Sequence, residues 1–388
     1  ENMSAMKSAI LLVISGTATL AMLVGCGGSS SMHPSMNPPT MPPNPVLSQL
    51  KTTTTIGSTV DPMNGDSNPY GLAIAPVTSA PINAGDLIVC NFNDKNGNAG
   101  AGTTIEDLAP MANSTPKRIA QDPSLAGCDA LALHNTNDVI WAAAYTANDN
   151  PVLKPTGTIE STLATSFGWM QPWGQIFALP SMTSGITANP IFYVSQAKNG
   201  SIVSVQVTST GAFVYNTIIS GFPSTVSPQN GILAPAGLTY DPNSDTLYIV
   251  SSDTNSVVAI ARASTVPANG IMVKAVTSSS GGSSSTSNSS LTFSGPAMAQ
   301  AAVVYSGVPL NFPVSSALLY NGDLVVGNTG DNNMVEIDPV HKKMVGTKLV
   351  DTGNPGAIFG IATSGSTVAT QTIYFNDDNS NSVVSISQ

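Results

Sequence analysis

The chain has 388 residues and a net charge of −10 at pH 7, with 41% hydrophobic and only 9% charged residues. Such an acidic, charge-poor surface cannot neutralise phosphates, which argues against nucleic acid and anionic membrane surfaces as partners. The apolar content is enough for a core, and one closed all-β domain can reach this length.

Residues 1–25 have the pattern of an export signal. Lys7 places a positive charge before an apolar segment at 9–24, which is short for a membrane span. The segment ends in Leu23-Val24-Gly25-Cys26, which resembles the lipobox of bacterial lipoproteins. In that family the signal is removed before the Cys and the Cys is acylated. The resemblance implies lipidation at Cys26 and an exported protein of the bacterial cell envelope, anchored by lipid at the outer membrane or cell surface. A plain secretory signal that contains a Cys is the alternative.

Residues 26–45 are rich in Ser and Pro and lack a periodic apolar pattern. Proline cannot donate to a sheet ladder, and a Pro-rich segment is semi-extended. We therefore expect a tether that holds a globular domain, residues 46–388, away from the membrane.

The stretch from 237 to 260 shows the unit from which this domain is built. Three short β-prone segments at 238–240, 246–251 and 256–260 are separated by Asp- and Asn-rich turns, whose short side chains bond their own backbone. Variants recur along the chain with a spacing of roughly 40 to 50 residues, which is typical of a propeller. The predicted strands of the six units are 68–76, 85–92 and 103–108; 128–133, 139–145 and 156–163; 172–178, 191–195 and 201–207; those within 237–260; 315–320, 322–328 and 334–338; and 357–363, 372–375 and 382–387.

Outer, fourth strands are predicted at 116–120, 213–219, 301–305 and 344–350. The sixth unit has no such strand, and an unpaired edge favours aggregation. The β-prone segment 49–60 precedes the first unit, so we expect it to complete the last blade. The fold class is therefore an all-β, six-bladed β-propeller closed by an N-terminal strand. Residues 278–290 are almost all Ser and Gly, and we expect a mobile insertion between the third and fourth strands of the fourth blade.

Several motifs resemble NHL repeats. Pro69-Tyr70-Gly71-Leu72-Ala73 and Pro172-Trp173-Gly174 are similar to the opening of that repeat, Gly322-Asp323-Leu324-Val325-Val326 to its second strand, and Asp253-Thr254-Asn255-Ser256-Val257 to its Asp turn. The resemblance implies a six-bladed propeller. Its relatives include streptogramin-lyase-like and lactonase-like enzymes, ligand-binding ectodomains and secreted bacterial propellers, so it specifies the fold and leaves the activity open.

Candidate catalytic residues are few. His33 falls in the tether, His341 in a turn, and His134 at the end of a strand, and no H-E-x-x-H motif is present. The turn from Asp241 to Asp245 alternates oxygen ligands but lacks the Gly and distal Glu of a calcium loop. Lactonase-like relatives hold a divalent ion at the channel mouth, but no ligand can be matched here. No catalytic residue is assigned, and calcium is the one cofactor left open.

Two sets of residues are candidates for binding at one end of the channel. Tyr70 and Trp173 precede the Gly that opens an innermost strand, so they should lie near the channel, where they stack on a ligand or simply wall it. Turns after the second strands should share one face and bind cations or sugars, or each cap itself; their candidate residues are Asn93, Asp94, Asp253, Asp331 and Asp377.

With Cys26 acylated, Cys90 and Cys128 remain in an oxidising compartment. Antiparallel order directs both toward the same face, so a disulfide is expected.

Whether the chain is an enzyme stays open at this stage. We favour a membrane-tethered module that binds a small molecule, a glycan or a protein. The alternative is a divalent-metal-dependent hydrolase or lyase of the lactonase or streptogramin-lyase-like kind.

Overall fold

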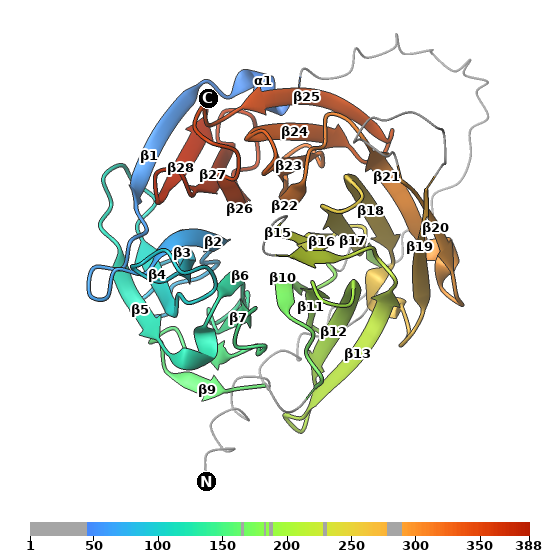
Figure 1. Ribbon diagram of the computed structural model, residues 1–388, viewed down its shortest axis with the longest axis horizontal. Helices are drawn as coiled ribbons and strands as arrows, with labels where there is room; N and C mark the ends of the chain where they lie inside the picture. The colour runs from blue at the N-terminus through green and yellow to red at the C-terminus, as the bar shows by residue number, and fades with distance from the viewer. Residues whose placement is uncertain (1–44, 164–166, 182–183, 186–188, 228–230, 278–288) are drawn as a thin grey trace, which may run out of the picture.

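The computed structural model describes residues 45–163, 167–181, 184–185, 189–227, 231–277 and 289–388. Within them, six sheets stand around a central axis like the blades of a propeller (Figure 1). This confirms the predicted six-bladed, all-β fold. The signal at 1–25, Cys26 and tether residues 26–44 lie outside the described residues. No described helix has the length and apolar content to cross a bilayer.

Each blade is an antiparallel sheet of four strands, and its first strand lies nearest the axis in all six. From the inside outward, the blades are: β2 (Ser67–Ile74), β3 (Leu87–Asn93), β4 (Thr104–Leu108), β5 (Lys117–Gln121); β6 (Cys128–Leu133), β7 (Ile140–Ala144), β8 (Val152–Leu153), β9 (Ile159–Ser161); β10 (Pro172–Ala178), β11 (Ile191–Gln196), β12 (Ser201–Val207), β13 (Phe213–Ser220); β16 (Pro235–Asp241), β17 (Thr246–Ser251), β18 (Ser256–Ala261), β21 (Ala301–Ser306); β22 (Pro313–Leu318), β23 (Leu324–Asn328), β24 (Asn333–Asp338), β25 (Lys343–Leu349); and β26 (Ile358–Ser364), β27 (Thr372–Asp377), β28 (Ser382–Ser387), β1 (Thr52–Ser58).

The core of the molecule lies between the blades. Both faces of an inner sheet pack against a neighbouring blade, so the second strands β7, β17 and β23 are buried along their whole length, and β3 is buried in all but its last residue. Their β-branched and aliphatic side chains form one cluster at each blade interface; Ile88 of β3 and Ala142 of β7, for example, belong to the same cluster. This packing explains why these strands are apolar throughout instead of alternating.

The ring is closed as predicted, by the N-terminal strand. β1 pairs antiparallel with β28, from Thr52 opposite Ser387 to Ser58 opposite Ser382. A short helix precedes it, α1 (Val46–Gln49), which the sequence did not indicate. The Glu336 carboxylate accepts hydrogen bonds from the backbone N–H groups of Val46 and Leu47, both at 2.8 Å. The N-terminal strand thus completes the sixth blade and ties the start of the domain to its end, and α1 is anchored on the fifth blade.

Two predicted details of the strands are wrong. The third strand of the second blade is β8, not 156–163, because Lys154 and Thr158 close a turn through Gly157, whose φ is +83°. Residues 289–290 of the predicted insertion belong to β20 (Ser289–Ser294), which pairs with β19 (Ile271–Thr277). Ser289 and Ser290 pair with Thr277 and Val276 through backbone hydrogen bonds, which do not depend on the Ser-rich side chains that suggested an insertion. The rest of that insertion, 278–288, lies outside the described residues.

The β19–β20 hairpin was not predicted as an element. It leaves the fourth blade and extends the third, because β19 runs parallel to β13, with Ile219 opposite Ile271 (Figure 1). A second hairpin, β14 (Thr225–Ser227) and β15 (Gly231–Leu233), lies near the centre of the ring. Three short 3-10 helices complete the described structure: η2 (Pro123–Leu125), η4 (Ala263–Thr265) and η5 (Met298–Gln300).

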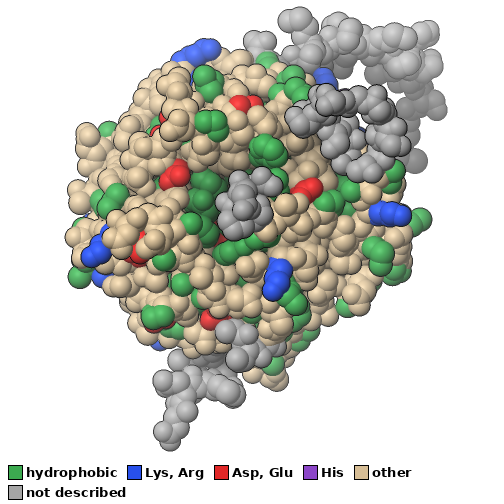
Figure 2. All heavy atoms as spheres, in the orientation of Figure 1, with side chains coloured by type: hydrophobic (Ala, Val, Ile, Leu, Met, Phe, Trp, Pro, Cys, Tyr) green, Lys and Arg blue, Asp and Glu red, His purple; other side chains and the backbone are tan. Residues whose placement is uncertain are grey.

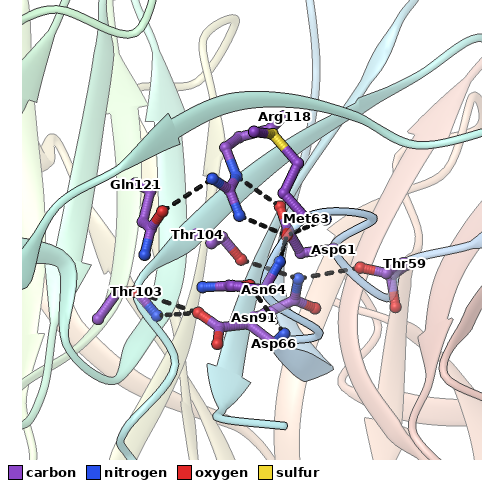
Figure 3. A network of polar contacts seen from close by, with 10 residues as sticks. All are labelled: Thr59, Asp61, Met63, Asn64, Asp66, Asn91, Thr103, Thr104, Arg118 and Gln121. Carbon is purple, nitrogen blue, oxygen red and sulfur yellow. Dashed lines mark hydrogen bonds and ion pairs between the residues drawn. The ribbon is translucent and has the colours of Figure 1, made fainter.

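A polar network fixes the connection from β1 to β2 (Figure 3). Arg118 donates to Asp61 through Nε at 2.7 Å, and Asp61 also caps the backbone of Met63 and Asn64. Burial works to raise the pKa of Asp61, but the Arg118 hydrogen bond and these backbone donors outweigh it and lower the pKa. In contrast, burial and the nearby Asp61 raise the pKa of Glu106 to about 9. The hydrogen bond from Arg118 and the bonds of Asp61 to the backbone of Met63 and Asn64 therefore hold the connection that leads into Tyr70 in place.

Candidate functional site

Each of the six innermost strands carries a β-bulge at the equivalent position. The register shifts fall between Pro69 and Gly71 in β2 and between Cys128 and Ala130 in β6, and the other four inner strands shift likewise. A bulge leaves a residue unpaired and re-aims its side chain. The residues left without a partner on the second strand are Tyr70, Asp129, Trp173, Ala236 with Gly237, Val314, and Phe359 with Gly360.

Glycines beside the bulges let neighbouring inner strands approach closely. A Cβ on Gly71 of β2 would lie 3.1 Å from the Cα of Ala130 in β6, and one on Gly360 of β26 would lie 2.7 Å from the carbonyl oxygen of Tyr70 in β2. Neither contact is sterically tolerable without movement of the neighbour, so these positions require glycine for space. The Gly after the aromatic residue in the predicted motif, such as Gly71, therefore lets neighbouring inner strands lie close together around the channel.

Two adjoining cavities occupy the axis. The inner one, about 80 Å³, lies among the inner strands and is lined by Asp129, Gln175 and Ser315, among others. The outer one, about 960 Å³, opens at one end of the channel, where β15 and several loops contribute. Figure 2 shows hydrophobic side chains gathered around the middle of this face. Four residues line both cavities and so lie at the boundary between them, which we call the passage: Tyr70, Trp173, Val314 and Phe359.

An aromatic cluster forms the wall of this passage. The Tyr70 ring is stacked between Phe92, at a centroid distance of 4.3 Å, and Phe359, at 3.6 Å. Trp173 stands nearly perpendicular to Tyr70 and Phe92, and also meets Tyr145 at 5.6 Å. Edge-to-face and offset-stacked pairs of this kind hold one another in place. We call these five residues the aromatic cluster: Tyr70, Phe92, Tyr145, Trp173 and Phe359.

Asp129 lies on the inner side of the aromatic cluster. Its side chain lines the inner cavity, is only 7% exposed, and neither carboxylate oxygen has a hydrogen-bond partner. Burial raises the pKa of Asp129 well above its ordinary value. The backbone N–H groups of Asp129 and Ala130 lie close enough to offset part of this rise, but they do not meet the geometry of a hydrogen bond. A carboxylate buried without a partner is costly to ionise. A positively charged group beside it would offset that cost, so the site favours a cation.

The Asp129 carboxylate, when ionised, also raises the pKa of two members of the aromatic cluster. Burial is the main cause that raises the pKa of Tyr70, with Asp378 and Asp129 adding to it. The pKa of Tyr145 is raised by burial and by Asp129. Both phenols are therefore neutral hydrogen-bond donors near this carboxylate.

Sequence reasoning did not single out Asp129. It occupies the bulge position of β6 that Tyr70 and Trp173 occupy in β2 and β10. Superimposing Cys128-Asp129-Ala130 on Pro69-Tyr70-Gly71 would have placed it at the channel, but the second repeat matches the motif poorly.

The structure brings together only part of the predicted set. Tyr70 and Trp173 lie in one cluster, as their place before the inner strands suggested. The four acidic turn residues line neither cavity, and each bonds within its own loop or to a neighbouring one. Their partners are Asn96 and Asn98 for Asp94, Thr225 for Asp253, Asn333 and Asn311 for Asp331, and Ser380 for Asp377.

Asn93 belongs to a small polar group behind Tyr70. With its amide oriented to satisfy its neighbours, Asn68 accepts from Asn93 Nδ2 at 2.8 Å and donates to Asp378. Burial, with the charge of Asp377, raises the pKa of Asp378 to about 6. This group adds a second acidic side chain near the Tyr70 hydroxyl. A binding role for Asn93 and the four turn carboxylates stays a prediction.

The described histidines lie away from the channel. His134 packs on Phe177, with ring centroids 4.9 Å apart, and His341 pairs with Asp338 at 2.6 Å in a turn. In the turn from Asp241 to Asp245, Asp245 accepts from the Tyr240 hydroxyl at 2.8 Å and is fully buried. Among the described residues, no group of three or more His, Cys, Asp or Glu is placed to hold a metal ion.

Cys90 and Cys128 form a disulfide, with Cα atoms 5.8 Å apart. It joins β3 of the first blade to β6 of the second. Because Cys128 immediately precedes Asp129, the cross-link also anchors the backbone of the bulge that presents this carboxylate.

Known proteins match this chain at the level of structure. No family model and no curated protein matches the sequence. The virginiamycin B lyase of Staphylococcus aureus is 13% identical, with a TM-score of 0.50 over 87% of this chain and 99% of the lyase. A gluconolactonase-like protein is 11% identical, with a TM-score of 0.52 over 89% of this chain and 96% of that one. At these identities the likeness concerns the fold, and the chain therefore shares the six-bladed β-propeller architecture of both.

Proposed function

We propose that the chain is a binding module that takes a small molecule in the outer cavity, against the aromatic cluster. The observation that carries this is the passage lined by Tyr70, Trp173, Val314 and Phe359 between two adjoining cavities. A volume of about 960 Å³ is at the upper end of the range for small-molecule sites, which are typically apolar with a few placed polar groups. Aromatic side chains with one buried carboxylate fit that description.

The alternative is a hydrolase or lyase, as the fold of the two similar structures suggests. A fold alone does not carry an activity. The described histidines, His134 and His341, are engaged with Phe177 and Asp338, so neither is placed to act as a base at the channel. We therefore favour binding. Turnover of a lactone or a streptogramin by the purified protein with Mg²⁺ or Ca²⁺ would support the enzyme instead.

Binding at the aromatic cluster can be tested with a fragment library and ligand-observed NMR. Ligands of the native protein should bind Trp173→Ala about five- to thirtyfold more weakly, because a lost aromatic contact removes on the order of 1–2 kcal/mol. Met63→Ala is the matched control, since Met63 is 74% exposed and lines neither cavity. Equal affinities for native protein and Trp173→Ala would place the ligands elsewhere and contradict the proposal.

We further propose that the propeller is held at the cell envelope by acylation of Cys26, on the lipobox-like sequence Leu23-Val24-Gly25-Cys26. Protein isolated from the membranes of a bacterial host should begin at Cys26 and carry the added mass of acyl chains. Cys26→Ser should release it into the soluble fraction, because one or two buried acyl chains supply the anchor. A mature chain that begins at any other residue would refute this.

A further inference from the structure

We propose that the ligand of the channel is an organic ammonium, a primary or secondary amine whose charge pairs with Asp129 while its apolar part packs on the aromatic cluster. This inference rests on the proposed function and adds the chemical class of the ligand. Three observations lead to it: the unpartnered carboxylate, the size and lining of the inner cavity, and the apolar wall above it.

The carboxylate supplies the charge preference. Asp129 is buried and has no hydrogen-bond partner on either oxygen. Among the described residues that line the two cavities, none is Lys or Arg. The titratable groups that its charge reaches are the phenols of Tyr70 and Tyr145, and Asp378 acts on Tyr70 from the sixth blade. All these groups are neutral or acidic. A cation is therefore the complement that is missing, and an anionic ligand would be repelled.

The inner cavity selects a small head group with N–H donors. Its volume is about 80 Å³, and its lining includes Ser315, whose buried hydroxyl oxygen lacks a partner. Asp129 lines the same cavity, so its carboxylate can accept hydrogen bonds from an ammonium group placed there. Gln175 Nε2 is also unpartnered and offers a donor to a neighbouring oxygen of the ligand. Charge-assisted hydrogen bonds of this kind are about twice as strong as neutral ones.

The wall of the passage selects an apolar body. Tyr70, Trp173, Val314 and Phe359 face both cavities, so a group attached to the ammonium meets rings and a branched aliphatic side chain. A bare metal ion would make no use of the apolar wall. Within the described part of the chain, Asp129 is the single carboxylate that lines the inner cavity, and hard cations usually take more oxygen ligands than this. A sugar would need several polar partners where the wall presents rings.

Three probes of one shape and different charge test the inference: 2-phenylethylamine, 2-phenylethanol and phenylacetate, with CaCl₂ alone as a fourth. Isothermal titration calorimetry of the mature chain at pH 7 should show the amine binding at least about tenfold more tightly than the alcohol, with phenylacetate weakest. Burial raises the pKa of Asp129, so ionisation of this carboxylate on binding of the amine should release protons to the buffer, measurable in two buffers of different ionisation enthalpy. Its affinity should rise with pH.

Asp129→Asn should abolish both the preference for the amine and the proton release, while Glu160→Gln, an equal change of charge at an exposed position of β9, should leave both intact. Thermal melts of the two variants show whether each is folded. If amine and alcohol bind equally, and Trp173→Ala weakens both, the proposed function stands and the inference is overturned. Amine selectivity that survives in Asp129→Asn also overturns it, as does binding of Ca²⁺ without the amine. If no probe binds saturably, both fail.

Discussion

A chain that lacks residues 47–60 should melt at a much lower temperature than the full domain and should aggregate. The deletion removes β1, so the backbone of β28 is left without the ladder from Thr52 to Ser58. It also removes Leu47, Leu50 and Ile56, which are 1%, 0% and 3% exposed. At about 1.5–3 kcal/mol for each buried side chain, roughly 5–9 kcal/mol is lost, comparable with the total stability of a typical domain.

Glu336 adds to this effect. It accepts hydrogen bonds from the N–H groups of Val46 and Leu47, and burial raises its pKa to about 7. The deletion removes the Leu47 N–H and the rest of the helix that positions the Val46 N–H, which destabilises the fifth blade as well. Calorimetry and light scattering measure the two outcomes. The matched control is deletion of 29–44, a Pro-rich segment expected to act only as a tether. Equal melting of both truncations would mean that the N-terminal strand does not hold the ring.

Replacing both Cys90 and Cys128 with Ala should lower the free energy of unfolding by about 4 kcal/mol. The two residues are 38 positions apart in sequence, and the chain-entropy model gives this figure for a loop of that length. Both side chains are fully buried, so Ala is chosen over Ser to avoid leaving a buried hydroxyl without a partner. Denaturant unfolding measures the effect, which should appear as a lower denaturant concentration at the midpoint of the transition.

The same variant bears on the site, because Cys128 lies next to Asp129. We expect a larger loss of stability than of ligand binding, since the bulge of β6 is also held by the β6–β7 ladder, from Cys128 opposite Ala144 to Leu133 opposite Ile140. Titration of two free thiols in the unfolded, unreduced protein would show that the cross-link does not form and would refute the prediction.

The strands, the turns and the closure of the ring could be predicted from the sequence because they depend on local chemistry. Asp and Asn at 241–245 and 253–255 bond their own backbone, and the β-prone segments between them have no other compact arrangement. The closing strand at 49–60 followed from an edge that would otherwise stay unpaired. The same local logic failed at 156–163, where Gly157 and its neighbours form a turn inside the predicted strand.

The site depends on contacts that sequence spacing does not encode. Tyr70 and Trp173 were predicted near the channel from their motifs, but Phe92, Tyr145 and Phe359 join them only because different blades converge on one axis. Asp129 is an ordinary Asp in its own repeat and becomes a buried, unpartnered charge only when rings from other blades cover it. Likewise, the β19–β20 hairpin extends the third blade and Glu336 anchors α1 across 290 residues of chain. The sequence by itself thus determined the blades and their closure, through local turn chemistry and β-propensity. Only the tertiary structure decided which side chains share the channel, since burial and the loss of water around a charge arise from neighbours distant in sequence.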